Sequence, residues 1–253
     1  MRIRTALTAL LLIGATAASA QAQKSITAAT YADPTSAYPH GVLGDEEEWA
    51  TLEIVVRSER GKEGGLLHAY LNTTYRIAAL EDMVYEDTAP RLWDVTGDGL
   101  PEVVVVASHQ QYGAQLVIIG LVDGELNYIA TTPTIGTRFR WLAPVGAADF
   151  DGDGHIEVAF VDRPHLAKTL RIWRYTPEAF TEVATQPGLT NHKIGEDFIT
   201  GGVRTCGSQP EIIVADAGWR NIMAARLGPD GITTEVLAPF NGTESVTRVL
   251  DCG

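Results

Sequence analysis

The chain has 253 residues, with 19 Lys and Arg against 32 Asp and Glu, which gives a formal net charge of −13. This excess of acid argues against nucleic-acid binding, because contacts with phosphates need Lys and Arg. It suits a soluble protein that holds cations, and no later segment is long and apolar enough to predict a membrane span.

The first residues have the pattern of a secretory signal peptide. A cationic start precedes an apolar run from Leu7 to Ala18, and small-residue cleavage sites end at Ala20 and Ala22. The run is too short to cross a bilayer, and this order of features is typical of a cleavable signal. We therefore predict a signal peptide over residues 1–22, a mature domain over 23–253, and export to the periplasm or the medium.

Short β-branched runs recur along the mature chain, each followed by a polar turn and further strand-like segments. The first runs of the repeats are Leu52–Val56, Glu102–Ala107, Glu157–Val161 and Pro210–Asp216. The segments that follow them are Gln115–Ile119, Leu126–Thr131, Thr169–Trp173, Phe180–Ala184, Asn221–Ala225 and Ile232–Leu237. Helical periods are scarce, so the pattern predicts an all-β protein built from units of about 55 residues, each with four antiparallel strands.

Two acidic loops, residues 94–102 and 149–157, match position by position. Each has an oxygen-bearing side chain at positions 1, 3, 5 and 9 and a Gly at position 6, where a chain that wraps an ion must turn sharply. Hard cations, above all Ca²⁺, take such oxygens, together with backbone carbonyls. The predicted ligands are Asp94, Thr96, Asp98, the Leu100 carbonyl and Glu102 in the first loop, and Asp149, Asp151, Asp153, the His155 carbonyl and Glu157 in the second. Because Thr96 replaces an acid, we expect the first site to be weaker.

An EF-hand is the alternative for these loops. It needs a bidentate Glu at position 12 and a helix on either side, but position 12 is Val105 in one loop and Phe160 in the other, and both flanks are β-branched. We therefore expect the loops to join strands.

The Asp-x-Asp-Gly-Asp-Gly-x-x-Glu loop between two strands resembles the FG-GAP/VCBS repeats of integrin-type β-propellers. The resemblance covers residues 90–120 and 145–173 well, and 201–227 in part, because residues 203–207 lack the acids. It implies a small β-propeller of four to five four-stranded antiparallel blades, with structural Ca²⁺ in the loops. The whole sequence also resembles uncharacterised exported FG-GAP repeat proteins of alphaproteobacteria, which implies no activity.

The ends of the chain are expected to close the ring. Ser25–Ala28 and Val246–Leu250 remain outside the repeats and would pair as strands. In an oxidising compartment the two cysteines, Cys206 and Cys252, are expected to form a disulfide that locks this closure. Two free thiols are the alternative.

A second group of residues follows the inner strands, on loops that a propeller would collect on one face. The group consists of Arg138, Arg140, Trp141, Asp162, Arg163, His165, His192, Asp216 and Trp219. Arg side chains and aromatic faces suit an anionic or carbohydrate ligand. The alternative is that these residues form salt bridges and caps between blades.

These patterns predict a monomeric, exported, calcium-binding β-propeller that acts as a binding or interaction module for a protein or an anionic or carbohydrate ligand. We assign no catalytic residues. The alternatives are an enzyme, either a hydrolase or a lyase acting on an anionic polymer or sugar through the Arg/His face, and a structural component of the cell envelope.

Overall fold

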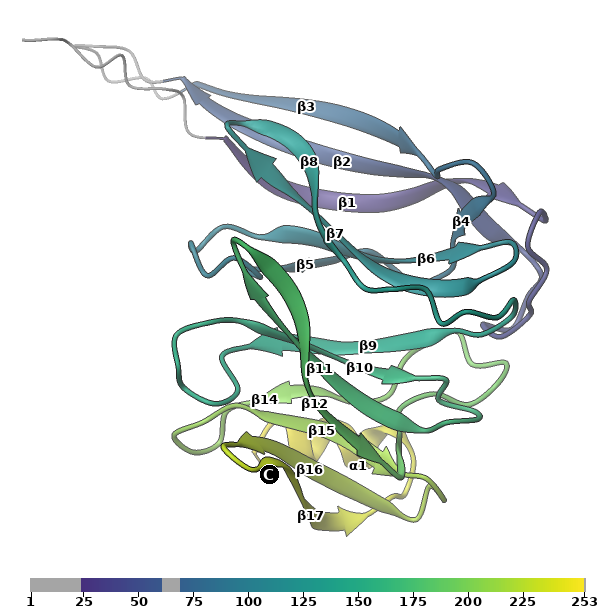
Figure 1. Cartoon of the computed structure of the whole chain (residues 1–253), viewed down its shortest axis with the longest axis vertical. Helices are drawn as coiled ribbons and strands as arrows, with labels where there is room; N and C mark the ends of the chain where they lie inside the picture. The colour runs from purple at the N-terminus through teal and green to yellow at the C-terminus, as the bar shows by residue number, and fades with distance from the viewer. Residues whose placement is uncertain (1–23, 61–68, 253) are drawn as a thin grey trace, which may run out of the picture.

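The computed structural model describes residues 24–60 and 69–252, so the predicted signal peptide lies outside the described residues. Within them, the chain forms 17 β-strands and one short helix. The strands belong to three sheets with antiparallel pairing, which confirms the predicted all-β class. They stack as four layers along the longest axis of the molecule (Figure 1).

Layer 1 contains β1 (Lys24–Thr35), β2 (Glu48–Arg60) and β3 (Ala69–Ala78), and layer 2 contains β4 (Met83–Tyr85), β5 (Arg91–Trp93), β6 (Glu102–His109), β7 (Gly113–Val122) and β8 (Glu125–Thr131). Layer 3 contains β9 (Leu142–Ala148), β10 (Glu157–Asp162), β11 (Thr169–Thr176) and β12 (Ala179–Pro187). Layer 4 contains β13 (Leu189–Thr190), β14 (Gly202–Arg204), β15 (Glu211–Asp216), β16 (Asn221–Gly228) and β17 (Gly231–Pro239), and the helix α1 (Thr243–Leu250) follows it. Layers 1 and 2 share one sheet through the pairing of Trp49 with Tyr85.

The unbroken apolar runs of the inner strands arise because both of their faces are covered. On β6, Val103 and Val105 pack toward layer 1, whereas Val104 and Val106 pack toward layer 3. The same alternation occurs on β10, which packs against layers 2 and 4. Since successive side chains of a strand point to opposite faces, a strand between two layers needs apolar residues at every position.

The first strand of a layer is interrupted in two layers. In layer 2, β4 and β5 both pair with β6, and residues 86–90 lie between them. In layer 4, β13 and β14 both pair with β15, and residues 191–201 lie between them. These insertions place polar side chains at the edge of the stack.

The prediction that the two chain ends pair as strands is wrong. Ser25 and Ala28 lie in β1 and pair with β2, and Val246–Leu250 forms most of α1. Val246 and Val249 are buried and contact Ile213 of β15 in one apolar cluster. Apolar residues three apart share one face of a helix, so this segment covers the outer face of layer 4 as a helix.

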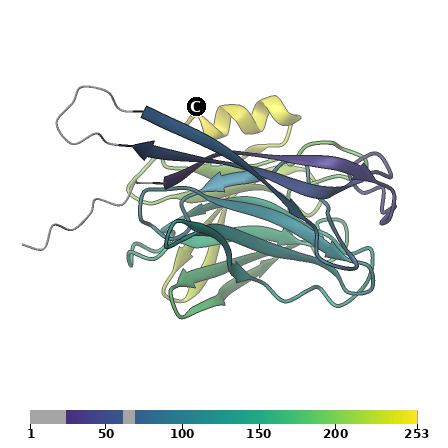
Figure 2. The ribbon, with the colours of Figure 1, turned by 90° about the horizontal axis from the view of Figure 1, so that it is seen from above.

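A loop connects layer 1 with the later layers. Residues 36–47, between β1 and β2, extend along the right-hand edge of Figure 1. The hydroxyl of Tyr38 accepts a hydrogen bond from the amide of Phe139 (2.6 Å), and the carbonyl of Val42 accepts one from the amide of Gly195 (3.0 Å). Seen from above, the stack curves, so that α1 lies on the same side of the view as the strands of layer 1 (Figure 2).

Candidate functional site

The acidic loops lie together at one edge of the stack. They join β5 to β6 and β9 to β10, and the corresponding loop of layer 4 joins β14 to β15 (left-hand edge of Figure 1). As predicted, each is a loop between strands rather than between helices.

Position 1 of each loop holds the turn closed. The carboxylate of Asp94 accepts hydrogen bonds from the amides of Gly97 (2.8 Å) and Gly99 (2.9 Å). Asp149 accepts the matching pair from Gly152 (2.7 Å) and Gly154 (2.9 Å). All four glycines have positive φ, which is favourable for Gly and lets their amides point at one carboxylate.

Position 9 closes the loop from the other side. Glu102 is 5% exposed, and its carboxylate accepts a hydrogen bond from the amide of Val95 (2.7 Å). Glu157 is fully buried, and its carboxylate accepts the matching hydrogen bond from the amide of Phe150 (2.8 Å). Burial raises the pKa of both glutamates above the ordinary value, although the hydrogen bonds to their carboxylates oppose this effect. The two loops therefore repeat one hydrogen-bond pattern as well as one sequence.

The second loop brings three carboxylates together. One oxygen from each of Asp149, Asp151 and Asp153 lies within 4.8 Å of the others, and this is the only such group of acidic, His or Cys side chains among residues 24–60 and 69–252. Each carboxylate oxygen has two lone pairs, so a hydrogen-bonded oxygen can still coordinate a cation. Both the donor set and its spacing fit a Ca²⁺ ion. The first loop lacks such a group because Thr96 stands at position 3.

An arginine already provides positive charge at the second loop. The guanidinium of Arg174, on β11, forms ion pairs with Asp151, with Asp153 (2.8 Å) and with Glu157 (2.6 Å). Sequence reasoning missed this residue, although its position opposite Glu157 follows from the antiparallel pairing of β10 and β11. The corresponding residue of layer 2 is Gly120, where an added Cβ would lie 3.1 Å from Cγ of Glu102.

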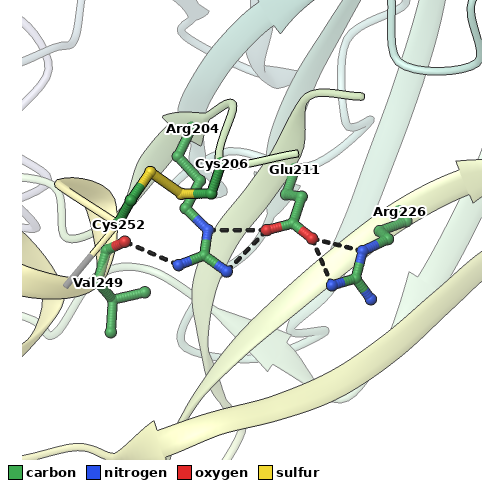
Figure 3. Close-up of a disulfide and its surroundings, with 6 residues drawn as sticks. All are labelled: Arg204, Cys206, Glu211, Arg226, Val249 and Cys252. Atoms are coloured by element: carbon green, nitrogen blue, oxygen red, sulfur yellow. Dashed lines mark hydrogen bonds and ion pairs between the residues drawn. A yellow bond between two sulfur atoms is a disulfide. The ribbon is translucent and has the colours of Figure 1, made fainter. Parts of the chain in front are cut away.

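In layer 4, arginines and a disulfide occupy the place of the acidic loop (Figure 3). Glu211 forms ion pairs with Arg204 (2.7 Å) and with Arg226, and Arg204 also donates to the carbonyl of Val249 (2.8 Å). Burial raises the pKa of Glu211, but the two guanidiniums outweigh burial and leave that pKa below its ordinary value. The predicted disulfide between Cys206 and Cys252 is formed, and it joins this loop to the residues after α1 rather than closing a ring.

The opposite edge of the stack contains a cavity of about 220 Å³ between loops of all four layers. Its polar lining consists of His40, Arg140, Arg163 and His165, and its apolar lining of Val42, Phe139, Trp141, Leu166 and Ile194. Four of the nine residues predicted as a ligand site therefore lie together: Arg140, Trp141, Arg163 and His165.

Two histidines at the cavity hold each other in place. The Nε2 of His192 is 2.8 Å from the carbonyl of Glu196, so it must be the protonated nitrogen. Its Nδ1 then accepts from the Nε2 of His165 (2.9 Å), which leaves the Nδ1 of His165 as an acceptor. Burial, followed by the nearby His192 and His40, lowers the pKa of His165 to about 4, so its ring is neutral at pH 7.

A buried carboxylate orients the third histidine. His40 donates from Nδ1 to one oxygen of Glu86, and the hydroxyl of Ser108 donates to the other oxygen. Glu86 and Ser108 are fully buried. Burial raises the pKa of Glu86, and the hydrogen bonds from His40 and Ser108 favour its carboxylate form against that effect. Sequence reasoning did not pair His40 with Glu86, because the two lie 46 residues apart and no local spacing connects them.

The remaining predicted ligand residues make other contacts. Arg138 lies over the rings of Tyr38 and Phe139. Asp162 binds Arg163 (2.8 Å) and Arg171 (2.9 Å), which both belong to its own layer, so these ion pairs are not the contacts between blades that the alternative predicts.

At the edge of layer 4, the predicted ligand residues form a local turn and a ring contact. The carboxylate of Asp216 accepts hydrogen bonds from the backbone amides of Gly218 and Arg220 and from the side-chain amide of Asn221. Trp219 packs against Phe240. Neither residue lines the cavity.

Comparison with known families identifies the acidic-loop region. Residues 94–160, which run from the first acidic loop into β10, match the FG-GAP-like repeat. A search of curated proteins finds no match. No helix among the described residues is long and apolar enough to cross a membrane. The matched segment contains both acidic loops, the whole of β6 and most of β10, so this part of the chain is similar to the FG-GAP-like repeat.

Proposed function

We propose that the protein is an exported β-propeller that acts as a binding module, with Ca²⁺ as a structural ion in its acidic loops. The four layers would be its blades, and the curve of the stack supports this arrangement (Figure 2). FG-GAP repeats suggest an interaction module, and the fold alone does not define a reaction. We expect a monomer, because polar side chains and α1 cover the two end faces of the stack.

The observation that carries the calcium proposal is the convergence of Asp149, Asp151 and Asp153 in a loop closed by its own backbone. Three carboxylates this close repel one another, and Arg174 neutralises only part of their charge. A bound divalent cation would remove the remaining repulsion, so its binding free energy would add to the stability of the folded chain.

Two features support export. The first residues have the pattern of a signal peptide, although they lie outside the described residues. The disulfide between Cys206 and Cys252 fits an extracellular protein, because such bonds persist in oxidising compartments.

Thermal unfolding with and without a calcium chelator tests the structural role. We expect chelation to lower the melting temperature of the wild-type protein and to have a smaller effect on Asp151→Ala, which removes one ligand. Calcium should raise the melting temperature of the wild type more than magnesium does, because the loop offers the flexible oxygen set that Ca²⁺ prefers. Equal melting curves under all conditions would contradict a structural ion.

The cavity favours a second candidate, an enzyme that acts on an anionic sugar or polymer. A histidine oriented by a buried carboxylate is a common proton acceptor in catalysis, and His40 with Glu86 has that arrangement. Incubation with anionic polysaccharides, followed by assay for new reducing ends or unsaturated products, separates the candidates. Turnover that His40→Gln abolishes would favour the enzyme, and saturable binding without turnover would favour the module.

A further inference from the structure

We propose that the cavity between His40, Arg140, Arg163 and His165 binds a hydroxylated organic acid of sugar size, such as a sugar acid, with Arg140 as the partner of its carboxylate. This inference deepens the proposed binding role and rests on it, because it names the ligand class. It does not depend on calcium, since the cavity and the acidic loops lie at opposite edges of the stack.

The charge of Arg140 is the first argument. Arg140 is partly buried, and its guanidinium donates only to the carbonyl of Phe139 (2.7 Å) in the described part of the chain. It has no carboxylate partner there, although acids outnumber bases by 32 to 19. A guanidinium stays protonated at any physiological pH, and a partly desolvated one is stabilised by an anion. Its fork geometry matches a carboxylate with two parallel hydrogen bonds.

The second arginine has a different role. Arg163 uses Nε and Nη2 to bind Asp162 (2.8 and 2.9 Å), which fixes the guanidinium at the cavity wall. Its remaining Nη1 can donate to a ligand without leaving Asp162. Arg163 is thus fixed by its ion pair with Asp162, whereas the guanidinium of Arg140 is available to form an ion pair with the ligand.

The two imidazoles supply acceptors. The Nδ1–H of His40 donates to Glu86, so the Nε2 lone pair of this cavity-lining ring remains available to accept a hydrogen bond. The hydrogen-bond chain through His192 likewise keeps the Nδ1 lone pair of His165 available as an acceptor. A ligand that meets both lone pairs must donate, and hydroxyl groups do this. An inorganic anion without hydroxyls would leave both acceptors unused.

The apolar lining and the volume limit the ligand's size and shape. Phe139, Trp141 and Leu166 form part of the wall, and Trp141 is almost completely buried. Aromatic and aliphatic walls with a few placed polar groups are typical of sites for small molecules. A cavity of about 220 Å³ suits one sugar-sized molecule or the end group of a longer chain.

Backbone conformation at the cavity is an independent observation. Phe139, which precedes Arg140, has φ 55°, and Arg163 has φ 45°. Such conformations cost about 1–3 kcal/mol each for residues other than Gly and are concentrated at binding and active sites. The amide of Phe139 donates a hydrogen bond to the hydroxyl of Tyr38 (2.6 Å). The amide of Arg163 donates one to the carbonyl of Trp141 (3.0 Å). The surrounding structure thus maintains one strained residue directly before Arg140 and a second at Arg163 itself.

Calorimetric titration of the purified protein tests the proposal with three probes. D-Glucuronate carries both a carboxylate and hydroxyls, D-glucose carries only hydroxyls, and inorganic sulfate is an anion without hydroxyls. We expect saturable binding of glucuronate and at least tenfold weaker binding of the other two, because each lacks one set of partners. Sulfate that binds as tightly as glucuronate would overturn the sugar-acid assignment, and so would the absence of any binding.

Matched variants locate the ligand. Arg140→Gln removes the proposed carboxylate partner, and Arg138→Gln is the control, two residues away and against the rings of Tyr38 and Phe139. Because a hydrogen bond to a charged group contributes about 1.5–3 kcal/mol, we expect Arg140→Gln to weaken glucuronate binding about 10- to 100-fold. Arg138→Gln should leave binding within about twofold of wild type. Equal losses in both variants would overturn the placement.

A measurement on the wild-type protein avoids dependence on the folding of a variant. Glucuronate should shift the imidazole NMR signals of His40 and His165 and leave that of His109 unchanged. Shifts that spare His40 and His165 would contradict the proposal. The same titration in the presence of chelator separates it from the calcium proposal, because loss of calcium binding should leave these shifts in place.

Discussion

At the scale of single residues, Glu48 is a carboxylic acid that is buried without a full set of hydrogen bonds. It is 2% exposed, and its Oε2 has no hydrogen-bond partner among the described residues. Burial, together with the nearby Glu86, Asp45 and Asp87, raises the pKa of Glu48 to about 9. The folded protein therefore keeps Glu48 protonated at pH 7, whereas the unfolded chain does not.

This difference predicts a pH dependence of stability. Between about pH 4.5 and 9 the folded state binds one proton more than the unfolded state, so Glu48 makes the free energy of unfolding fall as the pH rises. Glu48→Gln removes the titrating group, so we expect the variant to be more stable than wild type by about 1–3 kcal/mol at pH 8, with little difference at pH 4. Urea unfolding at both pH values measures this. A stability difference independent of pH would refute the assignment.

Arg174 is the residue that connects the acidic loop to its own sheet. Its partner Glu157 is completely buried, so removing the guanidinium leaves a buried acid without its ion pair. We expect Arg174→Gln to destabilise the calcium-free protein by about 1–3 kcal/mol and to increase the stabilisation that calcium provides, since the ion would replace the lost positive charge. The measurement is urea unfolding with and without calcium.

The control for Arg174 is Arg76→Gln. Arg76 also bridges two acids, Asp33 (2.6 Å) and Glu53, but its side chain is 53% exposed. Exposed ion pairs contribute about 0–1 kcal/mol, so this variant should remain close to wild type in both conditions. If Arg174→Gln behaved like Arg76→Gln, the proposed role of Arg174 at the acidic loop would be wrong.

At the scale of elements, strands and loops were predictable and the partners of side chains were not. The β-branched runs of β6, β10 and β15 and the acidic loops before β6 and β10 are local patterns, and both are where the sequence places them. Val246 and Val249 are β-branched and suggested a strand, but their spacing of three residues suits the helix that they form. The pairing of His40 with Glu86 depends on the folding of a loop across layers, which no local pattern encodes.

The contact between layers 3 and 4 depends on a residue without a side chain. A Cβ added to Gly146 of β9 would lie 2.3 Å from a methyl group of Val203 in β14. Val is stiff at χ1, so the layers must separate to accommodate the new methyl. We expect Gly146→Ala to destabilise the protein by about 1–3 kcal/mol in urea unfolding. Gly207→Ala is the control, because a Cβ there meets no atom within 4 Å, and a similar loss in both variants would contradict this account.

At the scale of the whole molecule, the two ends of the stack are finished in different ways. The outer face of layer 1 carries the ion pairs of Arg76 with Asp33 and Glu53. The outer face of layer 4 is covered by α1. A stack of repeats needs such end caps to remain soluble, because an inner layer is apolar on both faces. The sequence predicted that the two chain ends pair as strands, but residues 243–250 form a helix that packs on layer 4 instead.

The disulfide stabilises this cap. It closes a loop of 46 residues that contains most of layer 4 and all of α1. A crosslink over that separation stabilises the folded state by about 2–4 kcal/mol, mainly by restricting the unfolded chain. We expect the double variant Cys206→Ser with Cys252→Ser, and the reduced wild type, to lose stability by this amount in urea unfolding. An unchanged midpoint after reduction would show that α1 is held by its apolar contacts alone.

The most direct test of the account is a calorimetric titration of Ca²⁺ into chelator-treated protein, with wild type, Asp151→Asn and Asp230→Asn compared. Asp230 lies in the turn between β16 and β17 of layer 4 and is not part of the cluster of Asp149, Asp151 and Asp153. We predict saturable binding to the wild type, unchanged binding to Asp230→Asn, and binding to Asp151→Asn weakened about tenfold or more, because a charged ligand is lost. Absence of saturable binding to the wild type, or identical isotherms for all three proteins, would contradict a calcium site in the loop of residues 149–157.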